Sequence, residues 1–394
     1  MYTWNSAGAV HVGTADAQLD HPGEKAGRRR SVDAPRREAD NRAGEGRVRM
    51  RYRWSAPAAA LAAAAVCMVV VAPAAGGQAG QAVAPEWEPS RLPDGQPDIR
   101  GMWNNADANH TPLEMPDELA GRESFTREEL QAMAQARYEG KIAAGETHTE
   151  GTVGFYALYW WDWYFSDPVA GDWPALVIEP KNGRMPPQTE QSRDIAAYMR
   201  EHLHDTYANM EPGDRCISRG VLGMMLPTAY NNGTLIIQAP GYVVLHSEMI
   251  HNARIIPIDA GPPIDSRIEL WEGSPRGRWE GNTLVVESTN FRQVDNMRAP
   301  GGQRRSEWSH WELARQTPQR RIVERFTLVD PDTLKYSVHV DDPEVWTAPW
   351  TIAFPWRRDN EYRQYEYACH EGNYAVQNSL NGARVQERKA QEAR

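Results

Sequence analysis

The sequence predicts a mainly β protein of the α+β type, an antiparallel β-barrel or sandwich of about eight strands with two flanking helices. Short segments rich in β-branched and aromatic residues recur about every ten residues after position 234, and the Asn232-Gly233 hairpin signal precedes them. The predicted strands are residues 235–239, 242–248, 254–258, 283–289, 321–329, 333–340, 349–355 and 362–369. A closed barrel of about this size removes exposed strand edges and has room for one small ligand.

Residues 1–98 precede the predicted domain. Residues 1–49 are rich in Arg and Gly, and we expect them to be a disordered extension ahead of the true start at Met50. Residues 50–74 predict a signal peptide, with a basic start, an apolar stretch and an Ala-x-Ala-like cleavage site. A membrane anchor and a lipoprotein cysteine at Cys67 are the alternatives. Residues 75–98 predict a linker, and we expect a periplasmic or secreted protein that leaves the membrane after signal cleavage.

Charge excludes one class of partner. The chain has 43 Lys and Arg against 53 Asp and Glu, and its first 54 residues hold 11 basic and 7 acidic residues. The remainder therefore has 32 basic and 46 acidic residues, a net charge of −14. Such a protein repels phosphate backbones, so we do not expect a nucleic acid as partner.

Two cysteines, Cys216 and Cys369, follow the signal peptide. In an oxidising compartment this pair predicts a disulfide that closes a loop of about 150 residues, worth about 4–5 kcal/mol on the chain-entropy model. Two separate buried thiols are the alternative. Export does not favour a cysteine nucleophile, which would need a free thiolate.

Residues 99–394 predict a single globular domain, whose helical and aromatic part is residues 99–215. Thr126 and Glu129 form a capping box that predicts a helix to about residue 144, and residues 192–210 have a second helical pattern. Between them, residues 175–178 predict a short strand. The aromatic residues at 156–165, among them Trp160 and Trp163, pack a core or line a ligand cavity.

The β-barrel part is residues 216–372, and residues 373–394 form a polar tail. Five strings resemble a family of exported bacterial proteins that has no characterised member: CISRG, QAPGYV, EMIHNARIIP, RGRWEGNTLVV and EYACHEGNY, which begin at positions 216, 238, 248, 276 and 366. This resemblance covers nearly the whole mature chain and implies no activity. Separately, Gly101-Met102-Trp103 and the strand count resemble the calycin and lipocalin barrels, which implies an architecture and not a function.

The densest cluster of ionisable residues is His246, Glu248, His251 and Arg254. In a hairpin, Glu248 and His251 could act as acid and base on a carbonyl or enol, while Arg254 holds the developing negative charge. A structural ion-pair network is one alternative. A metal site on the two histidines and Glu248 is another, but the H-x-E-x-x-H spacing matches no metal-binding motif on a strand, and we assign no metal ligand or cofactor.

Further candidate ligand-binding residues come from three other places. The first is the mouth of the barrel, the second an aromatic wall, and the third the segment after Cys369, for which a plain structural turn is the alternative. These residues are Trp103, Asn104, His110, Trp160, Trp163, Trp279, His370, Glu371 and Tyr374. Residues 276–283 lack the ending of a phosphate-binding loop.

Two functional hypotheses follow. The first is an exported protein that binds a small apolar or aromatic ligand in a barrel cavity lined by Trp and Tyr. The alternative is a lyase, isomerase or hydrolase on the same scaffold, possibly assisted by a metal. The mature sequence has no Gly-x-Ser-x-Gly elbow, so we do not expect a serine hydrolase of the α/β type. No oligomeric state is predicted.

Overall fold

The computed structural model describes residues 87–146, 160–168, 171–300 and 311–394. The predicted signal peptide and residues 156–159 of the aromatic run lie outside these described residues. The strands are β1 (Gly101–Asn104), β2 (Val177–Glu179), β3 (Gly233–Ala239), β4 (Tyr242–Ser247), β5 (Asn252–Pro257), β6 (Ser274–Glu280), β7 (Thr283–Thr289), β8 (Val294–Pro300), β9 (Trp311–Gln316), β10 (Arg321–Asp330), β11 (Thr333–Asp341) and β12 (Trp350–Arg358). The helices are α1 (Arg127–Glu146), α2 (Asp162–Phe165), α3 (Glu190–Glu201), α4 (Gly220–Met225) and α5 (Ala375–Glu392), with short 3-10 turns η1 (Ala106–His110), η2 (Asp117–Leu119), η4 (Tyr207–Asn209) and η5 (Met249–His251).

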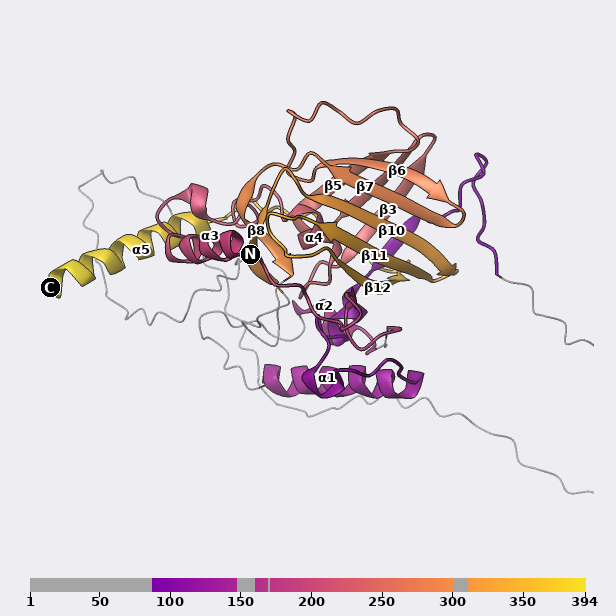
Figure 1. The fold of residues 1–394 in the computed structure, drawn as a ribbon, viewed down its shortest axis with the longest axis horizontal. Coiled ribbons are helices and arrows are strands. Elements are labelled where there is room, and N and C mark those ends of the chain that lie inside the picture. Colours follow the sequence, from indigo (N-terminus) through magenta and orange to yellow (C-terminus); the bar gives the residue numbers. More distant parts are fainter. Residues whose placement is uncertain (1–86, 147–159, 169–170, 301–310) are drawn as a thin grey trace, which may run out of the picture. The chain divides into compact units, whose positions relative to one another are not determined.

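Nine strands form a nearly closed antiparallel barrel (Figure 1). Their order is β5-β4-β3-β1-β12-β11-β10-β7-β6, while β2 also pairs with β12 and β8 pairs with β9 in a separate small sheet. The two ends of the sheet meet where the Asp259 amide donates a hydrogen bond to the Gly277 carbonyl (2.9 Å). A Cβ on Gly277 would lie 2.5 Å from Cδ1 of Ile258, so a larger residue there would force the Ile258 side chain to move. The predicted mainly β class and the barrel are confirmed.

Side chains fill the interior of the barrel. Alternate residues of β4, β5, β7, β10 and β11 point inward, as the period of two in a strand requires. These inward side chains have no accessible surface: Val243, Leu245, Ile256, Leu284, Val286, Phe326, Tyr336 and Val338. Helix α4 is completely buried and belongs to the same hydrophobic cluster. Atoms without accessible surface have no water-sized space beside them, so this part of the interior has no room for a ligand.

One ion pair lies inside this packed interior. Arg254 on β5 donates to Glu324 on β10 through Nη1 (2.9 Å) and Nη2 (2.5 Å), and both side chains are almost completely buried. The hydroxyl of Tyr336 donates to the same carboxylate (3.0 Å). Two charges this deep are tolerated because they face each other and because the hydroxyl gives the carboxylate a further hydrogen bond.

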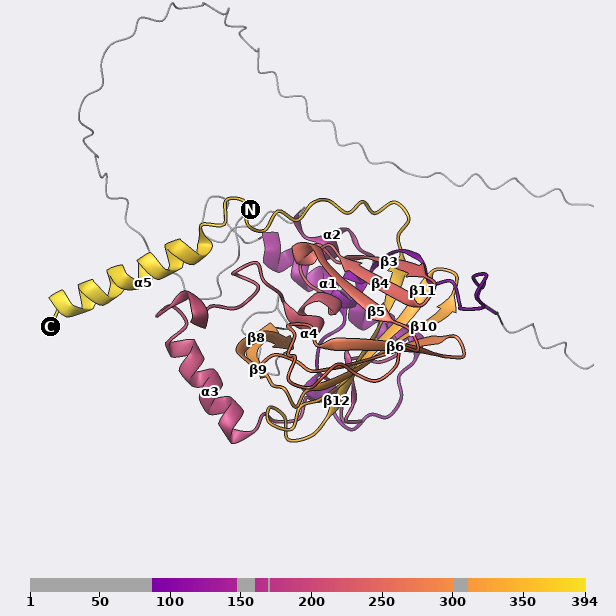
Figure 2. The same cartoon turned by 90° about the horizontal axis from the view of Figure 1, so that it is seen from above.

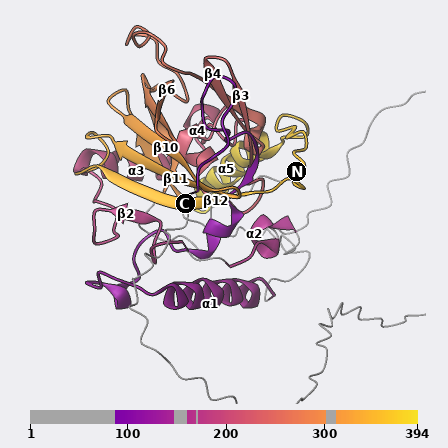
Figure 3. The ribbon, with the colours of Figure 1, turned by 90° about the vertical axis from the view of Figure 1, so that its right-hand side faces the viewer.

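Helix α1 begins with the predicted capping box. The Thr126 amide donates to Oε2 of Glu129 (2.9 Å), and the Glu129 amide donates to Oγ1 of Thr126 (3.2 Å). Figure 3 shows α1 on the side of the barrel that carries β12, with η1 between them. In Figure 2, α4 lies beside β8 and β9. None of the described helices combines the length and the apolar character needed to cross a bilayer.

Several predicted elements differ from the observed ones. The predicted helix at 192–210 is shorter, because α3 ends at Glu201 and the chain then turns. The Gly- and Met-rich stretch after Gly220, expected as a loop, contains the buried helix α4. Strands β8 and β9 were not predicted, and the predicted strand at 362–369 is wrong, since these residues have no strand pairing.

We expect the Glu324→Gln variant to lose about 3–5 kcal/mol of unfolding free energy, because it leaves the guanidinium of Arg254 in the interior without a counter-charge. The double variant Arg254→Met, Glu324→Leu should recover most of this loss. Urea unfolding measures both. The exposed pair Arg321–Glu287 joins the outer faces of β10 and β7 (2.6 Å) and is the control, which should change by less than about 1 kcal/mol when removed. A double variant as unstable as the single one would contradict this account.

Candidate functional site

A segment that we call the C-terminal strap, residues 359–369, runs from the end of β12 past β3 and β4. It does not pair with a strand. Hydrogen bonds from side chains and from single backbone amides hold it instead. The Asp359 amide donates to the Met102 carbonyl (3.0 Å), and Nε2 of Gln364 donates to the carbonyls of His246 (2.9 Å) and Gly233 (3.3 Å). Because β3 and β4 each already have two neighbouring strands, no edge is open for the strap to extend the sheet.

Glu248 lies directly after β4 and is almost completely buried under the strap. Its Oε2 accepts a short hydrogen bond from the hydroxyl of Tyr362 (2.5 Å), and its Oε1 accepts one from the amide of Tyr365 (3.3 Å). Burial and the nearby carboxylates of Asp162 and Glu248 raise the pKa of Tyr362 well above its usual range. The phenol therefore stays protonated and acts as a donor to Glu248.

A second carboxylate, that of Asp162 at the start of α2, lies close enough to Glu248 for their charges to interact. Its Oδ2 accepts hydrogen bonds from the backbone amide (2.9 Å) and the Nδ2 (3.0 Å) of Asn232. Burial raises the pKa of Asp162, and the charge of Glu248 raises it further, against the hydrogen bonds from Asn232 that lower it. A pair of carboxylates with unequal surroundings is an arrangement that can hold and transfer a proton.

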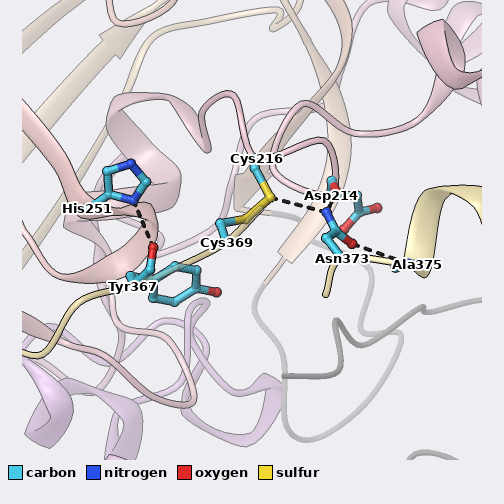
Figure 4. The surroundings of a disulfide bond; sticks show 7 residues. All are labelled: Asp214, Cys216, His251, Tyr367, Cys369, Asn373 and Ala375. Atoms are coloured by element: carbon cyan, nitrogen blue, oxygen red, sulfur yellow. Dashed lines mark hydrogen bonds between the residues drawn. A yellow bond between two sulfur atoms is a disulfide. The ribbon is translucent and has the colours of Figure 1, made fainter. Parts of the chain in front are cut away.

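The two predicted histidines both contact the strap through Nδ1. His251 donates from Nδ1 to the carbonyl of Tyr367 (2.9 Å), because a carbonyl only accepts (Figure 4). His246 donates from Nδ1 to Oε1 of Gln364 (2.9 Å), an orientation fixed by the two hydrogen bonds that the Gln364 amide group donates. In each neutral ring, Nε2 is therefore the nitrogen that can accept a proton. The imidazole of His251 is exposed, whereas that of His246 is half-buried.

The backbone after Glu248 is strained. Ile250 (φ 56°) and His251 (φ 43°) both adopt left-handed conformations, which are costly for a residue other than glycine and most of all for a β-branched one. Ile250 is held there because it is buried in a small cluster with Met249, Cys216, Cys369 and Tyr367. Strain of about 1–3 kcal/mol per residue is often found at functional sites.

The predicted disulfide between Cys216 and Cys369 is present and fixes the end of the strap (Figure 4). It connects the strap to the loop before α4, 153 residues earlier in the chain. Just after the disulfide, Asn373 donates from Nδ2 to the carbonyl of Asp214 (3.0 Å), two residues before Cys216. The disulfide therefore joins the segment that covers Glu248 to a second group of charged residues.

This second group lies on the loop before α4 and on β8. Glu211 forms a two-point ion pair with Arg298, in which Nε and Nη2 donate to Oε1 and Oε2 at 2.8 Å each. Burial and the nearby Glu211 raise the pKa of Asp214 to about 6. Burial and Arg298 lower the pKa of Arg219. The phenol groups of Tyr230 and of Tyr367, which is a strap residue, lie near this group.

The structure brings together only part of the predicted site. Glu248, His246 and His251 all meet the strap, but Arg254 points into the barrel and is paired with Glu324. His370, Glu371 and Tyr374 follow the disulfide and are exposed, and their side chains form no hydrogen bond with a described residue. They are therefore surface residues beyond the end of the strap.

The other candidates lie in or against the core. Trp103 is fully buried and donates from Nε1 to the Ile99 carbonyl (2.9 Å), while Arg358 covers its ring. Asn104 accepts a hydrogen bond from the Ala106 amide. His110 is buried beside Trp163, and burial lowers its pKa to about 3, helped by Lys141 and Arg137. Trp279 packs against the core from β6. Trp160 differs from these, because its ring is mostly exposed.

Sequence reasoning missed the residues that surround Glu248. Asp162 is the single acid within a run of aromatic residues, and this contrast was a usable signal. Tyr362 and Gln364 had no such signal, because they lie more than 110 positions from Glu248 and His246. Arg219 lies three residues after Cys216, in one of the strings quoted above.

We call Asp162, Glu248, His251 and Tyr362, with the aromatic side chains of Trp160 and Tyr365, the strap site. It has two carboxylates, a phenol donor and an imidazole, which suffice to bind polar groups or to transfer protons. No group of three or more His, Cys, Asp or Glu residues within the described ranges is arranged to hold a metal ion. No protein-family model, no curated protein and no solved structure matches this chain.

Proposed function

We propose that this protein is exported and binds a small molecule with an aromatic or apolar body at the strap site. The binding surface in this proposal lies outside the barrel, because the interior around Arg254 is filled by side chains.

The observation that carries the proposal is the position of two exposed aromatic rings. Trp160 is 62% exposed and precedes Asp162 by two residues, and Tyr365 is 75% exposed while its amide donates to Glu248. The two rings thus come from separate segments that meet at one buried acidic centre. Large aromatic surfaces beside a few convergent polar groups are typical of small-molecule sites.

Export is supported by two features. The pattern of residues 50–74 is that of a signal peptide, and the disulfide Cys216–Cys369 fits an oxidising compartment. The calycin-like architecture is part of the same proposal and is supported by the nearly closed barrel, whose β1 holds the buried Trp103. In this protein, however, α4 belongs to the packed core, which moves the proposed ligand to the outside.

We expect Trp160→Ala and Tyr365→Ala each to weaken the binding of a neutral aromatic probe, benzamide, by about 2- to 10-fold, because each removes one stacking face. A chemical-shift titration of the 15N-labelled mature protein measures the affinity. Tyr242→Ala is the matched control, since Tyr242 is also exposed but begins β4, at the end opposite Glu248. Equal affinities for the four proteins, or an equal loss in the control, would contradict the proposed location.

A second candidate function is acid–base catalysis at the same site. It is favoured by the charge interaction between Asp162 and Glu248 and by the exposed imidazole of His251, whose Nε2 is the basic nitrogen. In such an enzyme one of the two residues Glu248 and His251 would remove a proton from the substrate, and the other would return one.

The Glu248→Gln variant separates the two functions. If the protein only binds, the affinity for benzamide should stay within a few-fold, because glutamine can still accept the hydrogen bond from Tyr362. If it is an enzyme, turnover of its substrate should fall about 100-fold or more, since the amide cannot accept the proton. Glu366→Gln is the control, because Glu366 is exposed on the same strap. Unchanged turnover in Glu248→Gln would exclude Glu248 as the base.

A further inference from the structure

The side chain of Arg219 packs closely against two glycines. It precedes α4, three residues after Cys216, and its aliphatic stem passes between two glycines. A Cβ on Gly213 would lie 3.2 Å from Cγ of Arg219, and a Cβ on Gly223 would lie 2.7 Å from its Cβ. A larger residue at either glycine would therefore displace the arginine side chain.

The guanidinium group of Arg219 forms no ion pair with any residue that the structure describes. Among the described residues, no carboxylate oxygen lies within 4 Å of it, and its Nε is buried without an acceptor. Arg219 is half-buried, and a partly desolvated cation without a partner is unfavourable, so proteins often pair such a group. The lowered pKa of Arg219 has the direction expected for an uncompensated cation.

Two acids lie near Arg219, and neither forms an ion pair with it: Asp214 interacts with it at more than 4 Å, and Glu211 is already engaged. Both oxygens of Glu211 accept hydrogen bonds from Arg298, at 2.8 Å each. The phenol groups of Tyr230 and Tyr367 lie near the guanidinium. The phenol of Tyr367 can donate to an anion that the guanidinium also binds, so the two groups together suit a small acceptor.

Arg219 is also connected to the strap site. Tyr367, whose ring lies near Arg219, accepts the hydrogen bond of His251 at its carbonyl. Two residues earlier, the amide of Tyr365 contacts Glu248. The strap thus leads within two residues from the Glu248 contact to the ring that lies near Arg219.

We propose that Arg219 binds the carboxylate group of the ligand, so that the strap site takes small aromatic carboxylates. This inference rests on the proposed binding function and adds the chemical class of the ligand. The planar fork of a guanidinium matches the two oxygens of a carboxylate, and the phenol of Tyr367 supplies a further donor. The aromatic body of the ligand then lies against Trp160 and Tyr365.

The test compares three probes: benzoate, its neutral isostere benzamide, and acetate, which has the charge without the ring. We expect the wild-type protein to bind benzoate at least about 10-fold more tightly than benzamide, because the charged group adds hydrogen bonds to Arg219. Arg219→Gln should remove this preference and leave benzamide binding within about 2-fold. Arg363→Gln, a change at an exposed arginine on the strap, should keep the preference. Chemical-shift titrations measure all affinities, and urea unfolding verifies that each variant is folded.

The outcomes separate the two proposals. If benzoate and benzamide bind equally to the wild type, the anion site is wrong while the aromatic site stands. If acetate binds and Arg219→Gln abolishes that binding but benzamide does not bind, the aromatic site is wrong while the anion site stands. If neither acetate nor benzoate binding depends on Arg219, or if Arg363→Gln has the same effect, the inference is overturned. Should Arg219→Gln fail to fold, Arg219→Lys replaces it, because lysine keeps the charge but loses the two-point geometry and should weaken benzoate selectively.

Discussion

The packing of the barrel interior decides where a function of this protein can lie. Tyr336, Val338 and Phe326 have no accessible surface, and α4 adds its own buried side chains to the same core. The ion pair between Arg254 and Glu324 is part of this packing, because each charge depends on the other in a region without water. In the proposed function the ligand therefore binds outside this packed region, at the strap, where Glu248, Asp162 and Tyr362 come together.

The strap site combines several costly features that support one another. Glu248 is buried beside a second carboxylate, and the backbone that follows it is left-handed at Ile250. The cluster around the disulfide holds Ile250 in place, and the hydrogen bonds from Tyr362 and Tyr365 satisfy the buried carboxylate. Because the disulfide joins the strap to the loop before α4, it links the segment that covers Glu248 to the loop that carries Arg219. We therefore regard the two charged groups as parts of one functional region.

Much of the fold could be predicted from local patterns. The alternation of apolar residues in β3, β4, β7, β10, β11 and β12 and the capping box of α1 are local signals, and both were confirmed. The predicted Asn232-Gly233 hairpin is wrong, because no strand comes directly before β3, which pairs with β1 and β4. The candidate site was harder to predict from the sequence, because its contacts join residues that are far apart in the chain. Nothing near Arg254 in the sequence indicates that Glu324, 70 positions later, neutralises it inside the barrel. Residues 362–369 alternate like a strand, but the sequence does not show that no sheet edge is open to them.

The most direct test of this account is a crystal structure of the mature protein with benzoate bound. The account predicts that the ring lies against Trp160 and Tyr365, outside the barrel, with its carboxylate at the guanidinium of Arg219, while the interior around Arg254 and Glu324 is unchanged. Benzoate inside the barrel, with the Arg254–Glu324 ion pair opened to admit it, would contradict the account.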